Sequence, residues 1–225
     1  EKGLFTLGAT RGDGIVGEDI TDNLKTLPTI PLRIPVKEGI HVPDYIVFRG
    51  ESFITKTDFD NLNQEMEARG QKPYLNPRNT AAGSLRQLDP AITAQRPLKL
   101  YLYQVVESSE ALPLTQEAIL EYIASFGLPV NPLRWKANNI QQAVDICEAQ
   151  SANRHSWAYD ADGIVIKIND HKLYEDLGIV GKDPRGALAY KYPGEEVETA
   201  LLEIQVNVGR TGVLTPLAIL EPVAI

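Results

Sequence analysis

Residues Asn76–Pro90 read NPRNTAAGSLRQLDP and combine two arginines with a run of small side chains. Small residues at Thr80–Ser84 allow another molecule to approach the backbone closely. The guanidinium groups of Arg78 and Arg86 match phosphate oxygens bidentately, which favours a phosphate-bearing partner. A second interpretation stays open, in which a small-residue helix packs on a neighbour and both arginines form surface ion pairs. In either case, Asn79 is expected to cap a short helix.

The composition is that of an acidic globular protein. The 225 residues carry a formal net charge of −8, with 43% hydrophobic and 23% charged residues. This length accommodates one large domain or two small ones. No apolar run approaches the ~20 residues that a membrane span needs, so no membrane contact is expected. The charge argues against nucleic-acid contact over the whole surface but is compatible with a local basic track.

Cys147 is the only cysteine of the sequence, which excludes an internal disulfide and a cysteine zinc cluster within it. It falls on the apolar stripe of a predicted helix, so a buried and inert thiol is expected. A single thiol fits a reducing compartment, and a cytoplasmic location is expected.

Apolar periodicity predicts an α+β chain with mostly antiparallel sheets and flanking helices. A composition change near residue 195 predicts a domain boundary, followed by a half-buried strand and a hairpin. Strands are expected at 3–7, 45–54 with a bulge at Gly50, 98–106, 162–168, 187–192 and 202–208. Helices are expected from a Thr57 cap to about residue 69, at 115–126, and from an Asn139 cap. The helix that begins after Asn139 is expected to bury Ile140, Ala143, Val144 and Cys147.

Charged residues interrupt the apolar pattern of several strands and turns. Lys167 lies in DGIVIKI, Lys191 between two tyrosines in AYKYP, Glu51 in RGE and Arg11 in the glycine-rich turn TRGDG. A lysine on the second face of a strand usually points to solvent, yet together these residues describe a cleft lined with cations and one or two carboxylates. Such a cleft suits a nucleotide, whose phosphates attract Lys and Arg and whose hydroxyls or metal attract carboxylate.

The motifs TRGDG, RGE, NPRNTAAGSLRQLDP, DGIVIK and AYKYPGEE, in this order, resemble the adenylation domain of bacterial NAD-dependent DNA ligases. VGRTGVLTP after them is similar to the start of that family's OB-fold. The resemblance covers essentially the whole chain. It implies a nucleotidyltransferase (ATP-grasp-like ligase) adenylation domain over residues 1–195 and the first OB-fold strands over 196–225. The Asn76–Pro90 stretch is specific to the NAD-dependent branch, whereas the lysine motifs occur across nucleotidyltransferases.

The resemblance implies an enzyme that seals nicks in DNA during replication and repair. In that family a lysine attacks the adenylyl phosphate of NAD, the AMP passes to the 5′-phosphate at a nick, and the 3′-hydroxyl displaces it. NAD, Mg²⁺ or Mn²⁺, nicked double-stranded DNA and a monomeric state are therefore expected, in a bacterial cytoplasm. Zinc is expected only in a C-terminal segment of the family that lies outside these residues.

The resemblance also assigns roles to individual residues. Arg11, Glu51 and Tyr103 are expected to bind the cofactor, Tyr103 by stacking on adenine. Lys167 and Lys191 are expected to contact the adenylate and to neutralise charge during transfer, as binding and catalytic residues. The remaining roles are metal binding by Asp162 and Glu51, and contacts to DNA phosphates by Arg78, Arg86 and Arg154.

The sequence departs from the family in one essential motif. The nucleophilic lysine belongs to KxDG, which occurs nowhere in these residues; the resemblance places it about ten residues upstream of position 1. The chain as given is therefore expected to form no lysyl-AMP and to seal no nick. Gly186 stands where the family usually has a bulky aromatic residue. Both ends of the chain are expected to be cut from a longer protein.

Two alternatives stay open. An ATP-dependent nucleotidyltransferase would share Lys167, Lys191 and Glu51 but lack the Asn76–Pro90 stretch. A catalytically inactive adenylation-like module, retained for nucleotide or protein binding, would explain the missing KxDG but not the other motifs. In each case the C-terminal hairpin is expected to be poorly ordered or to lean on a neighbour, because a lone hairpin is marginal in water.

Overall fold

A computed structural model describes residues 1–35, 39–181, 183–194 and 196–223. The chain divides into two compact units, Glu1–Tyr190 and Lys191–Ile225. The boundary expected at residue 195 falls on a residue outside the described ones and stays a prediction. Within the described part of the chain, no helix is long and apolar enough to cross a membrane.

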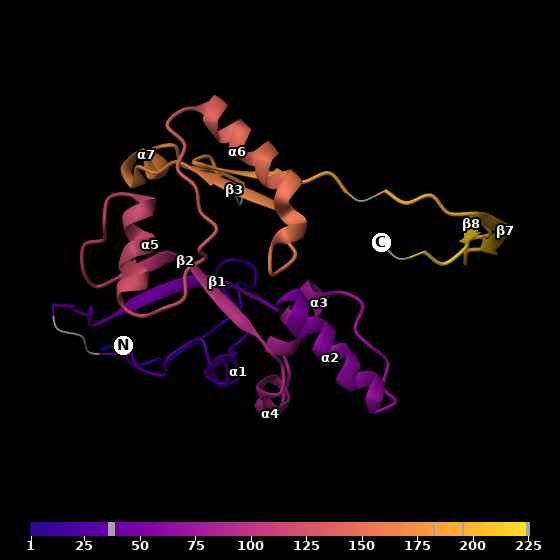
Figure 1. Ribbon diagram of the computed structural model, residues 1–225, viewed down its shortest axis with the longest axis horizontal. Coiled ribbons are helices and arrows are strands. Elements are labelled where there is room, and N and C mark those ends of the chain that lie inside the picture. Colours follow the sequence, from indigo (N-terminus) through magenta and orange to yellow (C-terminus); the bar gives the residue numbers. More distant parts are fainter. Residues whose placement is uncertain (36–38, 182, 195, 224–225) are drawn as a thin grey trace. The chain divides into compact units, whose positions relative to one another are not determined.

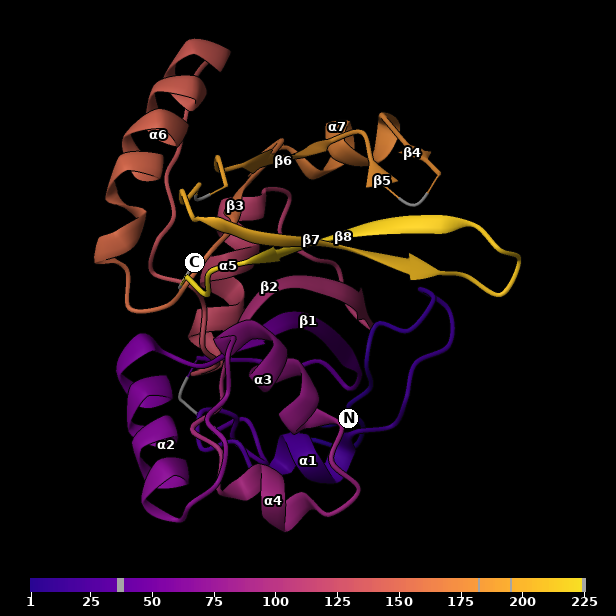
Figure 2. The same cartoon turned by 90° about the vertical axis from the view of Figure 1, so that its right-hand side faces the viewer.

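The first unit is built around one antiparallel strand pair, β1 (Ile46–Phe53) and β2 (Lys99–Ser108). Figures 1 and 2 show this pair running between two groups of helices. The first group contains α1 (Thr21–Lys25), α2 (Lys56–Ala68), α3 (Pro77–Leu85) and α4 (Pro90–Ala94), and the second contains α5 (Gln116–Ser125) and α6 (Ile140–Asn153).

The strand pair contains two bulges. Arg49 pairs with Gln104 and Gly50 pairs with Leu102, so Tyr103 is an extra residue on β2. A bulge was expected at Gly50, and the structure instead places the additional residue on the opposite strand. A Cβ on Gly50 would lie 2.6 Å from the carbonyl oxygen of Tyr101, so only glycine fits here. Bulges re-aim side chains beside functional sites, and this one carries the candidate adenine-stacking ring.

Apolar cores lie on both sides of the strand pair, and Leu100 packs against each of them. Burying a leucine, isoleucine or phenylalanine side chain stabilises the fold by ~1.5–3 kcal/mol, so these layers hold β1 and β2 in place. The core toward α5 contains Ile34, Leu102, Val105, Ile119, Ile123, Phe126 and Leu128; the core toward α3 contains Ile20, Leu27, Ile54, Ala81, Leu85 and Leu98.

The helix starts follow the sequence with two corrections. Asn76, not Asn79, caps α3: its side-chain oxygen accepts the Asn79 N–H at 3.0 Å. Pro77 supplies the reason, because its fixed φ and missing N–H suit the first helical position. Thr55, not Thr57, caps α2 and accepts the Asp58 N–H. The predicted Asn139 cap of α6 is confirmed, and the helix expected at 115–126 is α5, with Thr115 as its cap.

The apolar stripe of α6 is buried only in part. Cys147 is buried, as expected, whereas the Ile140 and Val144 side chains are 75% and 38% exposed. The helix packs on β3 (Gly163–Lys167), a five-residue strand that leaves the first turns of α6 uncovered. The expectation that Ile140 and Val144 would be buried is therefore wrong.

A buried polar network joins the Asn76–Pro90 stretch to α1 and α4. The side-chain amide of Asn23 donates to the Gln87 carbonyl at 2.9 Å and to Thr93 Oγ1 at 2.7 Å. Thr93 Oγ1 donates in turn to the Ser84 carbonyl, and Ser84 Oγ donates to the Thr80 carbonyl. Because buried polar groups require partners, the backbone carbonyls of Gln87 and Ser84 help to dock α1 and α4, whereas the Ser84 hydroxyl bonds within α3.

The remaining elements of the first unit follow α6. Strand β3 pairs with β6 (Ala187–Lys191), and between them lie α7 (His171–Asp176) and the short antiparallel pair β4 (Ile179–Val180) and β5 (Asp183–Pro184). The strand expected at 3–7 is wrong; the structure has a single antiparallel bridge there, between Leu4 and Arg33.

In the second unit, β7 (Leu201–Val208) and β8 (Leu214–Leu220) form an antiparallel hairpin. The expectation of a half-buried strand is wrong, since Ile204 and Val206 are 63% and 56% exposed. The physical reason is that the described part of this unit contains no helix or second strand pair to cover either face.

Candidate functional site

Lys167, the last residue of β3, lies over the ring of Tyr103 on β2. Its Nζ is 4.9 Å from the ring centroid, a cation–π distance. Burial lowers the pKa of Lys167, and the positive charge of Arg49 lowers it further. The alternating pattern of DGIVIKI was compatible with a Lys167 side chain that points to solvent. In the structure this side chain is instead partly buried on an aromatic ring.

Three further charged residues act on Tyr103. Burial raises the pKa of Tyr103 above its ordinary value; Arg49 and Arg11 oppose this effect, and Glu51 adds to it. The structure thus brings Arg11, Glu51, Tyr103 and Lys167 into one electrostatic cluster. Arg49 belongs to the same cluster and was not among the predicted site residues. The signal that could have found it is its charge in the apolar strand β1, two positions before Glu51.

Arg11 is held in a tight turn that closes on itself. The Thr10 N–H donates to the Glu18 carbonyl at 2.9 Å, and Asp13 Oδ1 accepts the N–H groups of Ile15 and Val16. The hydrogen bonds from Val16 and Ile15 lower the pKa of Asp13. Gly12 has φ +55°, and a Cβ there would lie 1.7 Å from the Val16 carbonyl oxygen. The turn therefore requires glycine next to Arg11.

Both arginines of the Asn76–Pro90 stretch form ion pairs. Arg86 Nε and Nη2 donate to the two carboxylate oxygens of Glu18, each at 2.5 Å, and this hydrogen bonding lowers the pKa of Glu18. Arg78 Nη1 donates to Asp162 Oδ2 at 2.8 Å. The interpretation of a tightly packed small-residue helix with paired arginines therefore describes this structure. The Glu18 carboxylate offers Arg86 the same bidentate acceptor geometry as a phosphate.

The other predicted residues come from other elements of the chain. Arg154 opens the short 3₁₀ helix η1 (Arg154–Ser156) after α6. Lys191 is the last residue of β6 and the first of the second unit. Asp162, a predicted metal ligand, is paired with Arg78. Among the residues that the structure describes, no three His, Cys, Asp or Glu side chains gather in a metal-binding group.

A partly desolvated lysine on an aromatic ring, with arginines and a glutamate acting on the same ring, marks a candidate functional site. Comparison with known proteins makes the class specific. The family model of the NAD-dependent DNA ligase adenylation domain matches residues 1–195, and the chain belongs to this family.

Curated relatives agree with the family. The chain is 45% identical over 227 residues to the DNA ligase of Myxococcus xanthus (strain DK1622), covering 100% of this chain and 34% of the relative. It is 48% identical to the DNA ligase of Desulfitobacterium hafniense (strain DSM 10664 / DCB-2), covering 99% and 33%. It is 46% identical to the DNA ligase of Bacillus subtilis (strain 168), covering 100% and 33%. The chain spans about a third of the length of these relatives.

Proposed function

We propose that this chain acts as the adenylation domain of an NAD-dependent DNA ligase that seals nicks with a 5′-phosphate and a 3′-hydroxyl. Family membership and the names of the relatives support this function. The observation that carries it in the structure is the Lys167–Tyr103 contact within a cluster that also holds Arg11 and Glu51. The adenylyl half of NAD is the ligand proposed for that cluster.

Each member of the cluster has a proposed role. Tyr103, the extra residue of the β2 bulge, stacks on adenine. Glu51 accepts hydrogen bonds from the ribose hydroxyls, and Arg11 contacts the cofactor from its rigid turn. Lys167 and Lys191 contact the adenylate and offset the charge that develops on the phosphate during transfer. Positioning and charge neutralisation are the main contributions that a protein makes to such transfers.

The attacking lysine is proposed to come from a KxDG motif, which these 225 residues do not contain. An attacking lysine must be neutral, and nearby cations lower its pKa. Mg²⁺ is proposed as a cofactor because it commonly binds through one or two carboxylates together with substrate phosphates. Glu51, and Asp162 when released from Arg78, supply such carboxylates; the metal would neutralise phosphate charge.

Nicked double-stranded DNA is the proposed polymer substrate. Arg78, Arg86 and Arg154 are proposed to contact its phosphates, with Arg86 exchanging the Glu18 carboxylate for a phosphate of the same bidentate geometry. The β7–β8 hairpin is proposed to be the start of an OB-fold, on the basis of VGRTGVLTP. A monomeric state and a bacterial cytoplasmic location complete the proposal.

A second candidate function is nucleotide binding without catalysis. A substituted lysine at the family's KxDG position would favour it, whereas the cluster around Tyr103 supports the enzyme. The two candidates make the same prediction for AMP binding and opposite predictions for covalent adenylation.

The test compares this chain with a version extended upstream to include the coding sequence before Glu1. Both are incubated with Mg²⁺ and with NAD or ATP labelled in the adenylate. Label transferred from NAD, only in the extended version, is the expected result. Label from ATP alone would assign the chain to an ATP-dependent nucleotidyltransferase. No label in either version, with AMP still bound, would favour the inactive module.

A binding measurement tests the site itself. AMP affinity of this chain is compared with that of Lys167→Met and of Lys172→Met, an exposed lysine on α7 that serves as the matched control. Loss of one charged contact to a phosphate or base corresponds to about tenfold in affinity. Lys167→Met should weaken binding by about that factor, and Lys172→Met should not. Equal affinities in both variants would remove Lys167 from the site.

A further inference from the structure

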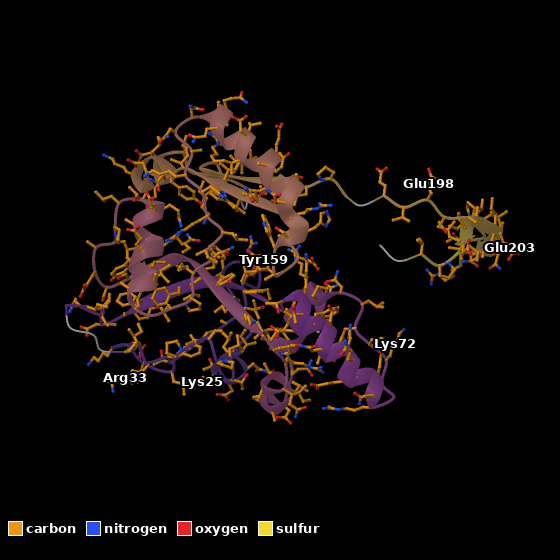
Figure 3. All side chains as sticks on the ribbon, in the orientation of Figure 1. Lys25, Arg33, Lys72, Tyr159, Glu198 and Glu203 are labelled. Carbon is orange, nitrogen blue, oxygen red and sulfur yellow. The ribbon has the colours of Figure 1, made fainter. Side chains whose placement is uncertain are left out.

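Five aromatic rings form a continuous cluster that the proposed ligation chemistry does not use. Phe53 stacks on Tyr101 with centroids 4.6 Å apart, and Tyr159 lies 5.0 Å from Phe53. Trp157 is 6.2 Å from Tyr159, and Trp135 stacks on Trp157 at 6.2 Å. Figure 3 labels Tyr159 on the segment between α6 and β3, beside the end of the β1–β2 pair.

Beside these rings lies an open pocket of about 440 Å³. Its volume falls within the range of small-molecule sites, roughly 300–1,000 Å³. The apolar wall contains Tyr101, Trp157 and Tyr159, and the polar wall contains Gln150, Asn153 and Ser156. Tyr103 and Lys167 do not line this pocket, so it is distinct from the cluster proposed for adenylate.

The polar wall consists of groups that can both donate and accept hydrogen bonds. The side-chain amides of Gln150 and Asn153 make no hydrogen bond within the described residues, while Ser156 Oγ donates to the Asn153 carbonyl and fixes the turn. Flat rings on one side and amides on the other match a planar heterocycle with polar edges. An aliphatic chain would leave the amides unmatched, and an anion would have no use for the rings.

We propose that this pocket binds a nucleobase, as a second ring site separate from the one at Tyr103. The inference rests on the pocket's own residues and goes beyond the proposed function. Stacking of a base on an aromatic side chain is sequence-tolerant, because every base offers a π-face. Arg154 lies between two of these polar residues, Asn153 and Ser156, in the chain. A free nucleotide and an unpaired base of DNA present the same chemistry here.

The protein carries its own reporter for this site. The sequence contains two tryptophans, and both belong to the aromatic cluster. Trp135→Phe leaves Trp157, a pocket residue, as the only indole. In that background we expect adenosine and thymidine to quench tryptophan fluorescence in a saturable manner. Gln150→Ala and Asn153→Ala should each weaken binding about three- to tenfold, the effect of one lost hydrogen bond.

Two controls separate this site from the others. Gln141→Ala is matched to Gln150→Ala, since Gln141 is an exposed glutamine of the same helix bonded to Asp145, and it should leave the quenching unchanged. Lys167→Met should also leave it unchanged. If Lys167→Met lost the quenching while Gln150→Ala and Asn153→Ala kept it, the base would be placed at Tyr103 and the proposal would be overturned. Absence of saturable quenching by either nucleoside would overturn it as well.

Two DNA probes identify the source of the base. Saturable quenching by a single-stranded oligothymidylate, but not by the corresponding blunt duplex, would support the pocket as a site for unpaired DNA bases. Quenching by nucleosides alone would support it as a site for a free nucleotide. Because neither readout requires adenylation, a failure of the ligase proposal would not affect these results.

Discussion

The ammonium of Lys167 on β3 rests on the face of Tyr103 on β2, with 4.9 Å between Nζ and the ring centroid. A cation–π contact of this kind contributes ~0.5–2 kcal/mol, more when it is desolvated. It offsets part of the cost of burying the lysine near Arg49. The contact therefore favours the charged form of Lys167, whereas burial and the charge of Arg49 lower its pKa.

Stability should reveal the lowered pKa of Lys167. Because this pKa lies below the ordinary value of 10.5, the unfolded chain binds more protons in the window between the two values. The free energy of unfolding therefore gains a contribution that rises with pH there, and the cost of burying the charge is fully present at lower pH. Lys167→Met lacks this contribution. The free energy of unfolding is measured in urea for both proteins at pH values from 8 toward 10.5. As the pH rises, the wild type should gain stability relative to Lys167→Met. A difference in free energy that stays constant with pH would contradict the lowered pKa.

The Glu18–Arg86 pair predicts an effect on DNA binding. Glu18→Gln removes the carboxylate charge from the Arg86 fork, so affinity for nicked duplex at low salt should rise a few-fold. Arg86→Ala should lower affinity and reduce the slope of log K against log salt by about one. Glu65→Gln, which disturbs another exposed pair with Arg69, is the control and should have little effect. Unchanged affinity in both Glu18 and Arg86 variants would remove Arg86 from the interface.

Replacing Gly83 of α3 should affect stability and DNA binding in opposite directions. It lies inside the helix with no atom within 4 Å of an added Cβ, so Gly83→Ala should stabilise the fold by ~0.5–1 kcal/mol. Thermal unfolding should show this as a rise of about 2–4 °C per kcal/mol for a chain of this size. If the DNA held by Arg78 and Arg86 also contacts the α3 backbone between them, the same variant should bind nicked duplex more weakly. Stronger or equal binding would show that the small side chain is not needed for contact.

Gly186 lies against the ring of Tyr174, so an aromatic ring at position 186 should be able to replace the one at position 174. A Cβ on Gly186 would lie 2.4 Å from Tyr174 Cδ2, so the Tyr174 ring occupies the space of the aromatic residue expected at 186. Gly186→Ala should destabilise the fold by ~1–3 kcal/mol, the usual cost of overpacking. Gly186→Phe should also destabilise the fold. Adding Tyr174→Ala to Gly186→Phe should recover part of that lost stability, as measured by chemical denaturation. If the double variant were less stable than the sum of its single changes, the two rings would not share one space.

Local features of the fold were predictable from the sequence, and long-range ones were not. The Asn139 cap, the helix at 115–126 and the strands around 45–54 and 98–106 follow from short patterns and are confirmed. The Asn76 cap could have been found from the proline that follows it. Exposure of Ile140 could not, because it depends on how much of α6 a five-residue strand covers.

The candidate site shows the same division. Motifs placed Arg11, Glu51, Tyr103 and Lys167 in one family pattern, and the structure brings them into one electrostatic cluster. The partner of Arg86 could not be predicted, since Glu18 lies 68 residues away in the chain. Arg49 was missed because its effect on Lys167 depends on how β1 and β3 approach each other.

The hydrogen bond between Asn23 and Thr93 spans 70 residues of sequence. Closing so long a loop is entropically costly, and contacts of this kind slow folding. During synthesis, α1 must leave the ribosome and wait until residue 93 has emerged before its amide can find its partners. The native hydrogen bonding of α1 therefore depends on chain that is synthesised later, and stopped-flow refolding of Asn23→Ala should be slower than that of the wild type, with a less stable folded state.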